Sequence, residues 1–215
     1  SKPQATMADI ADQMRSIQGM DTVEVNRSAK VRLPFDAELY APFIEIEDDP
    51  ESLATFYETT TNSEAQYGAP LISVNSDMIK LYNKTARQKI DIDAFEKGEV
   101  CLIGYVDSIS ASERMTDKTL TLVNDQTGRK RQITVGAAMM RAEQSAITAG
   151  YYWTLGGAPE AIFVSDAVMD DLFPDAAISC IIADAEKGKE SEVTAYVQRI
   201  VKENPVIAGS DIKSV

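Results

Sequence analysis

The stretch AIFVSDAVMDDLF, residues 161–173, carries the clearest structural pattern in the chain. Its first four residues are apolar, which predicts a buried strand. Ser165 then precedes a helical pattern in which Val168, Met169 and Leu172 share one face. The stretch therefore predicts a strand that leads directly into a short helix. The carboxyl ends of such strands are frequent places for active sites, so we judge its polar residues first.

The four polar residues are interpreted as scaffold. Ser165 stands at the N-cap position, and Asp166 lies at the positive end of the helix dipole. Asp170 and Asp171 are interpreted as a solvated helix face. A catalytic serine would need a general base, and the chain contains no histidine. That absence excludes Ser-His-Asp and Cys-His catalysis, as well as HExxH-type zinc sites.

Two internal similarities indicate how the chain is organised. The segment ISVNSDMIKLY, residues 72–82, resembles residues 162–172, because each places a polar cap between an apolar strand and a helix. The opening helix and strand, residues 7–25, resemble residues 193–211, an amphipathic helix followed by a strand. We therefore expect the first and last segments of the chain to pack together as similar units.

The predicted fold class is α+β. Residues 1–60 and 156–215 are expected to form a split βαβ-type, porter-like body, and residues 61–155 an inserted β-rich lobe. From residue 90 to 135 the pattern predicts strands, including a hairpin around the turn NDQTG. A short helix is expected over 137–150.

The closing segment predicts a strand, a helix and a strand. These elements are expected over 177–183, 190–203 and 206–212, and the helix keeps strict apolar spacing.

Composition excludes several kinds of function. The chain has 215 residues and a net charge of -13, which disfavours nucleic-acid binding. No apolar run reaches the length of a membrane span. The acidic segment EIEDDPE, residues 45–51, lacks the spacing of a calcium loop, and no nucleotide-binding motif is present. No catalytic residue, metal ligand or cofactor is therefore expected. Cys101 and Cys180 lie in apolar runs, where buried free thiols are favoured over a disulfide between them and the disulfide is kept as the alternative.

The aromatic cluster YYW is the most unusual surface candidate. Tyr151, Tyr152 and Trp153, the only tryptophan, precede a glycine pair. Such a cluster either packs in a core or forms a patch for a partner or ligand. We keep both interpretations open.

The layout resembles the extracytoplasmic domain of FtsX/MacB-type ABC transporter permeases, also called the MacB-like periplasmic core. Three features carry the resemblance: an opening amphipathic helix followed by GMDTVEV, the middle segment LISVNSDMIKLY before a β lobe, and the closing run from 162 to 201. In this family such a domain lies between two membrane helices. The first residue, Ser1, is consistent with a segment excised from a longer protein.

The resemblance implies a location, partners and a task. The chain would lie on the extracytoplasmic face of a bacterial cell membrane, in a permease expected to be dimeric. Its partner would be an ATP-binding subunit or domain of the same transporter. The domain itself would be non-catalytic and would couple ATP hydrolysis to export, or to signalling toward an extracytoplasmic protein, peptide or small molecule.

Two other functions are kept as alternatives. The chain could be a free-standing extracytoplasmic module that binds a ligand or protein, with Tyr151, Tyr152 and Trp153 as its patch. A carboxylate-based hydrolase ranks last, and glycoside hydrolysis that is lost in a single Asp or Glu variant would overturn this ranking. Apolar spans on both sides of this segment in its gene would favour the permease.

Overall fold

The structure is a computed structural model that describes residues 3–33, 68–106, 109–140, 143, 161–207 and 209. The chain divides into two compact units, residues 1–26 with 178–215, and residues 27–177. The first and last segments of the chain therefore belong to one unit. The predicted boundaries, near 60 and 155, fall outside the described residues, so that division stays a prediction.

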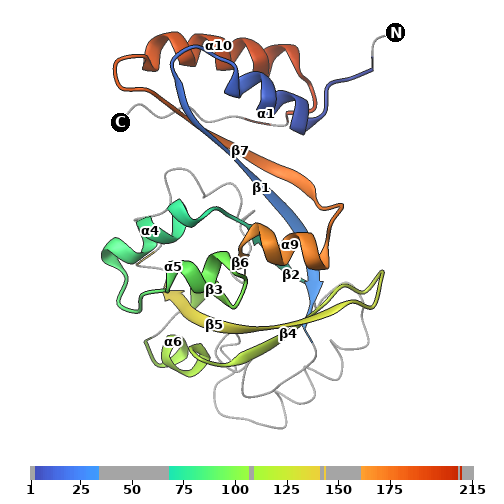
Figure 1. The fold of residues 1–215 in the computed structure, drawn as a ribbon, viewed down its shortest axis with the longest axis vertical. Helices are drawn as coiled ribbons and strands as arrows, with labels where there is room; N and C mark the ends of the chain where they lie inside the picture. The colour runs from blue at the N-terminus through green and yellow to red at the C-terminus, as the bar shows by residue number, and fades with distance from the viewer. Residues whose placement is uncertain are drawn as a thin grey trace. The chain divides into compact units, whose positions relative to one another are not determined.

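The described residues of the unit formed by the chain's two ends make helices at either end of the sequence and a ribbon of strands (Figure 1). Its elements are α1 (Met7–Arg15), the first half of β1 (Met20–Arg32), nearly all of β7 (Ala177–Ala185) and α10 (Glu190–Glu203). Helix α1 begins in a capping box. The Asp9 amide donates to the Thr6 hydroxyl at 3.1 Å, and the Thr6 amide donates to the Asp9 carboxylate at 2.9 Å.

Contacts between distant segments hold this unit together. The Gly19 carbonyl accepts the amide of Glu186 at 2.8 Å, and the Ser179 hydroxyl donates to the Asn26 carbonyl at 3.2 Å. β1 and β7 therefore run in opposite directions. Gly19 has a φ of +89° and lies so close to Lys189 that an added Cβ would be 2.9 Å from the lysine Cβ. Glycine is needed there because both the backbone conformation and the close approach disfavour a side chain.

The strands of the second unit pair with one another in a closed circuit. Its further elements are β2 (Gly68–Ser73), α4 (Ser76–Thr85), α5 (Ile92–Glu96), β3 (Val100–Val106), α6 (Ile109–Met115), β4 (Thr119–Val123), β5 (Lys130–Met140), β6 (Ile162–Val164) and α9 (Asp166–Leu172). The sheet order is β2-β6-β3-β5-β4-β1-β7, and β1 also pairs with β2. Parallel and antiparallel pairs alternate through much of this order. The mixed sheet and the helices confirm the predicted α+β class.

Apolar side chains from the strands of this circuit form the core of the second unit. Leu71, Val135 and Val164 are fully buried, and Cys101 lies among them. Burial raises the pKa of the Cys101 thiol to about 12. Both cysteines are free, as predicted, and Cys180 is only partly buried. Cys101 therefore acts as a small apolar core residue.

The similarity between residues 72–82 and 162–172 corresponds to two adjacent strand–helix units. β2 and β6 are parallel neighbours, with Ile72 opposite Phe163. Each strand ends at an extended N-cap residue. Asn75 begins α4 and accepts the amide of Asp77 at 2.8 Å, whereas Ser165 begins α9 without a side-chain cap bond. The same backbone path is therefore capped in two different ways.

Some predicted elements differ from the structure. Residues 90–135 contain two short helices, α5 and α6, which the strand-like pattern concealed. Residues 137–140 continue β5 and are not helical, because Ala137 and Ala138 pair with Leu102 and Ile103 of β3 and are buried there. Residues 206 and 207 lie at a turn after α10, so the predicted strand is absent there.

The two N-caps give a matched test. Asn75→Ala should lower the free energy of unfolding by about 1 kcal/mol, because it removes the bond to the Asp77 amide. Ser165→Ala should change it by less than about 0.5 kcal/mol, because the buried Ser165 hydroxyl has no partner among the described residues. Urea unfolding of both variants measures the difference. Equal losses would show that the Ser165 hydroxyl does contribute a cap bond.

Candidate functional site

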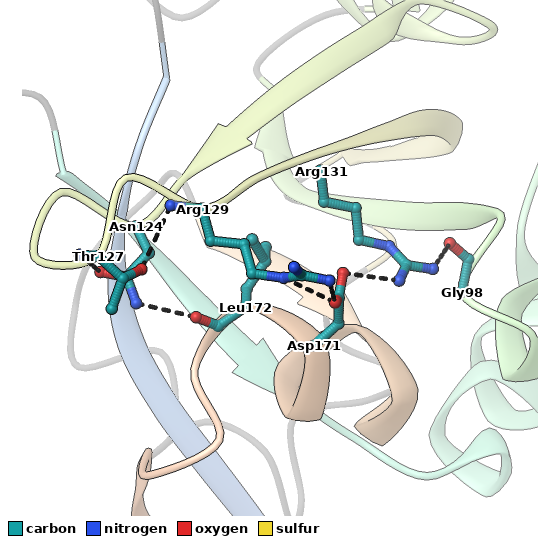
Figure 2. A network of polar contacts seen from close by, with 7 residues as sticks. All are labelled: Gly98, Asn124, Thr127, Arg129, Arg131, Asp171 and Leu172. Atoms are coloured by element: carbon teal, nitrogen blue, oxygen red, sulfur yellow. Dashed lines mark hydrogen bonds and ion pairs between the residues drawn. The ribbon is translucent and has the colours of Figure 1, made fainter.

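Asp171, one of the polar residues of 161–173, lies in a network of polar contacts that joins α9 to the β4–β5 hairpin (Figure 2). Asp171 is its centre. Arg129 donates to one Asp171 oxygen through Nε at 2.9 Å and through Nη2, and Arg131 donates to the other oxygen at 3.1 Å. Both arginines belong to the β4–β5 hairpin. Asp171 therefore ties α9 to that hairpin.

Arg131 extends the network to the turn before β3. Its second amino group donates to the Gly98 carbonyl at 2.9 Å. Gly98 has a φ of +76°, and an added Cβ would lie 2.6 Å from Arg131 Nη2 and 2.8 Å from Val168. Glycine is therefore required both for the turn and for the approach of the arginine.

Asn124 makes a second connection between the hairpin and α9. Its amide nitrogen donates to the carbonyl of Leu172 at 2.8 Å, which satisfies an acceptor at the end of the helix. Its side-chain oxygen accepts the amides of Gln126 and Thr127 at 3.0 and 3.4 Å. Asn124 is 5% exposed. One buried side chain thus shapes the hairpin turn and fixes the helix to it.

Arg27 of β1 binds the other acidic residues of α9. One amino group donates to Asp166 at 3.1 Å and to Asp170 at 2.7 Å. These aspartates are four residues apart and share one helix face, where like charges repel each other. The arginine, which is 17% exposed, offsets that repulsion.

The charges perturb the ionisation of this network. The hydrogen bond from Arg129, followed by that from Arg131, holds the pKa of Asp171 below its usual value although partial burial opposes this. Burial lowers the pKa of Arg27, but the hydrogen bonds and charges of Asp170 and Asp166 outweigh it and leave the pKa raised. Asp171 and Arg27 therefore both stay charged near neutral pH.

The interpretation as a solvated face is confirmed for Asp170, which is 66% exposed although it binds Arg27. It was wrong for Asp171, which is only 23% exposed and binds two arginines. Ser165 occupies the predicted N-cap position. Its hydroxyl is buried without a described partner, and no base contacts it. No nucleophile and base are brought together among these residues, and the arrangement is suited to bracing.

The candidate aromatic patch lies outside the described residues. Tyr151, Tyr152 and Trp153 therefore remain a predicted partner or ligand patch, and the acidic segment 45–51 is likewise outside them. The part of the chain that the structure describes contains no group of three or more metal-binding side chains. Within that same part, no helix combines the length and apolar character that a membrane span requires.

Arg27, Arg129 and Arg131 were not predicted, because only their acidic partners lie in the stretch 161–173. One signal could have found them. Arg129 and Arg131 are two residues apart at the start of a strand, so their side chains point to the same face. Two cations on one face of a strongly acidic chain predict an acidic partner segment. Arg27 carries no comparable local signal.

Comparisons with known proteins give only distant similarities. No family model matches the chain, and no curated protein matches it. The extracellular domain of the noncanonic ABC-type transporter YknZ from Gram-positive bacteria is 10% identical with a TM-score of 0.48, over 94% of this chain and 86% of that one.

The periplasmic region of MacB from Actinobacillus actinomycetemcomitans gives similar values. It is 11% identical with a TM-score of 0.48, over 94% of this chain and 75% of that one. Both proteins are of the kind that the sequence resembles. Identity and TM-score are too low to transfer a function.

Asp171→Asn should lower the free energy of unfolding by about 1–2 kcal/mol near pH 7, because it leaves the partly buried Arg131 without its anion. Asp175→Asn is the matched control, since Asp175 is exposed just after the same helix. Urea unfolding measures both variants. Equal stabilities of the two variants would contradict the proposed role of Asp171.

The ion pairing of Asp171 also predicts that the stability of the protein depends on pH. The folded pKa of Asp171 is lowered, so its carboxylate stabilises the fold above the unfolded value of about 4. This contribution is lost as the pH falls from about 4 through the lower folded pKa. The stability difference between the parent protein and Asp171→Asn should therefore shrink below pH 4. A difference that stays constant down to about pH 2 would exclude the ion pair as its cause.

Alanine substitutions at two glycines distinguish the effect of steric crowding from the effect of backbone strain. Gly98→Ala and Gly128→Ala both place alanine at a φ near +75°, but nothing lies within 4 Å of a Cβ at Gly128. Gly128→Ala should lower the free energy of unfolding by about 1 kcal/mol, and Gly98→Ala by at least about 1 kcal/mol more. Thermal unfolding of both variants tests this. Similar losses would mean that Arg131 moves aside freely.

Proposed function

We propose that the chain is a non-catalytic extracytoplasmic domain of an FtsX/MacB-type ABC transporter permease. One observation carries the proposal. The first and last described helices, α1 and α10, belong to one compact unit, and residues 27–177 are inserted between its two parts. A domain held between two membrane helices needs both of its ends in one place, and this layout meets that need. It is also the layout that the sequence resemblance implies.

The polar chemistry of the described residues supports a mechanical task. Among the described residues, Arg27, Arg129 and Arg131 are paired with the three aspartates of α9. Such networks fix elements in place, and they leave none of these aspartates free to act as an acid or a base. The proposed domain would pass conformational change between an ATP-binding partner and the exterior, and the hydrolysis of ATP would belong to that partner.

The test uses the protein in its own cells. Antibodies against this domain should detect a membrane-bound polypeptide longer than 215 residues. External protease should cleave it in intact cells or spheroplasts, and detergent extracts should copurify an ATP-binding protein. A protein of about this length in the soluble extracytoplasmic fraction would overturn the proposal. That result would favour a free-standing binding module.

A further inference from the structure

β7 is an edge strand in the unit formed by the chain's two ends. Among the strands that the structure describes, it pairs only with β1, so its second edge is open there. Proteins usually protect such an edge with charged residues, proline or a bulge, because unpaired backbone groups recruit further strands. Residues 177–183 of β7, AISCIIA, contain no charged residue, proline or glycine. The edge therefore lacks the usual protection against pairing with another strand.

The core of this unit is small. Among its described residues, the buried apolar side chains are Ile10, Ala11, Met14 and Val193. The apolar residues between 178 and 183 of β7 are only half-buried, and because successive side chains alternate, both faces of the strand are affected. Units below about 70–80 residues often need oligomerisation or another staple to be stable. A further strand on β7 would cover part of this half-buried surface.

The sequence of the open edge fits a second copy of itself. When two copies of 177–183 run antiparallel and are centred on Cys180, every facing pair is uncharged. The pairs are Ala177 with Ala183, Ile178 with Ile182, Ser179 with Ile181, and Cys180 with its own copy. Asp184 falls outside the paired stretch, so no like charges face each other. The same stretch thus serves both sides of a two-fold contact, which favours a second copy over a different partner.

The hydrogen bonds of β7 define what Cys180 meets in this register. The Glu186 amide donates to the Gly19 carbonyl, so the amides of even-numbered residues along β7 point toward β1. Cys180 then forms a non-hydrogen-bonded pair with its copy, with the two Cα atoms about 4.5 Å apart. That separation is within the reach of a disulfide. Cys180 is a free, partly buried thiol, whereas Cys101 is fully buried.

We propose that β7 is a self-association surface, and that two copies of the chain pair through antiparallel β7 strands centred on Cys180. The contact joins the β1–β7 ribbons of both copies into one continuous sheet. It is small for an interface, so its dissociation constant is expected in the micromolar range. The net charge of -13 makes two copies repel each other, and salt weakens that repulsion. The contact suits a permease domain and a free binding module alike, so its failure would leave the proposed function untouched.

Sedimentation equilibrium of the 215-residue chain in about 0.15 M salt tests the self-association. A reversible dimer is expected, and Ser179→Lys should raise its dissociation constant at least about tenfold, because a lysine on an edge strand opposes pairing. Ser179→Ala is the matched control, since it removes the same hydrogen bond to the Asn26 carbonyl without adding a charge. A parent chain that stays monomeric at about 0.3 mM would overturn the proposal, as would equal dimerisation of the two variants.

Oxidative cross-linking tests the register. Added copper(II) phenanthroline accepts two electrons from the two Cys180 thiols, which lose their protons and form a disulfide between the copies. Burial and the charge of Glu24 raise the pKa of the Cys180 thiol, so the reaction is run near about pH 9.

The matched control for cross-linking moves the cysteine along the same face of β7. In Cys180→Ser with Ile182→Cys, the new thiol faces residue 178 of the other copy, so its yield of disulfide-linked dimer should be at least about tenfold lower than that of the parent protein. Cys101 is present in both proteins and does not affect the comparison. Equal yields, or a higher yield from the shifted cysteine, would overturn the pairing centred on Cys180.

Discussion

The ion pair between Asp171 and Arg131 is the constraint on which the second unit depends. It joins the helix after β6 to the hairpin of β4 and β5, and through the Gly98 carbonyl it reaches the turn before β3. These strands are distant in sequence, and their pairings close into a circuit only when each lies in register. Apolar burial supplies most of the stability of such a unit, but it is non-directional. The directional contacts at α9 select one arrangement of these elements.

The same helix is braced from two sides. Asp171 and Asn124 hold one side of α9 to the hairpin, and Arg27 holds another side to β1. Contacts of this kind fix a helix in place through directional bonds, which apolar packing alone does not supply. Such bracing is compatible with the mechanical task that we propose for the domain.

Local patterns predicted the local structure well. The strand and helix of 161–173, the closing helix and the hairpin were all placed from apolar spacing, because burial imposes that spacing directly. The helices α5 and α6 were missed, since each is too short to show a clear helical period, and α5 is marked mainly by its Asp91 cap. The role of α9 was only half predicted. Its acidic residues are visible in sequence, but their partner Arg27 is more than 130 residues away, and no local rule pairs them.

A double-mutant cycle on Asp171 and Arg131 tests the central claim most directly. Asp171→Asn, Arg131→Met and the double variant are compared by urea unfolding near pH 7 in low salt. The account predicts that the two single variants together lose about 1 kcal/mol or more of unfolding free energy beyond what the double variant loses. The reason is that removing both charges leaves neither one uncompensated. Strictly additive losses would contradict the claim and would reduce the network to independent surface charges.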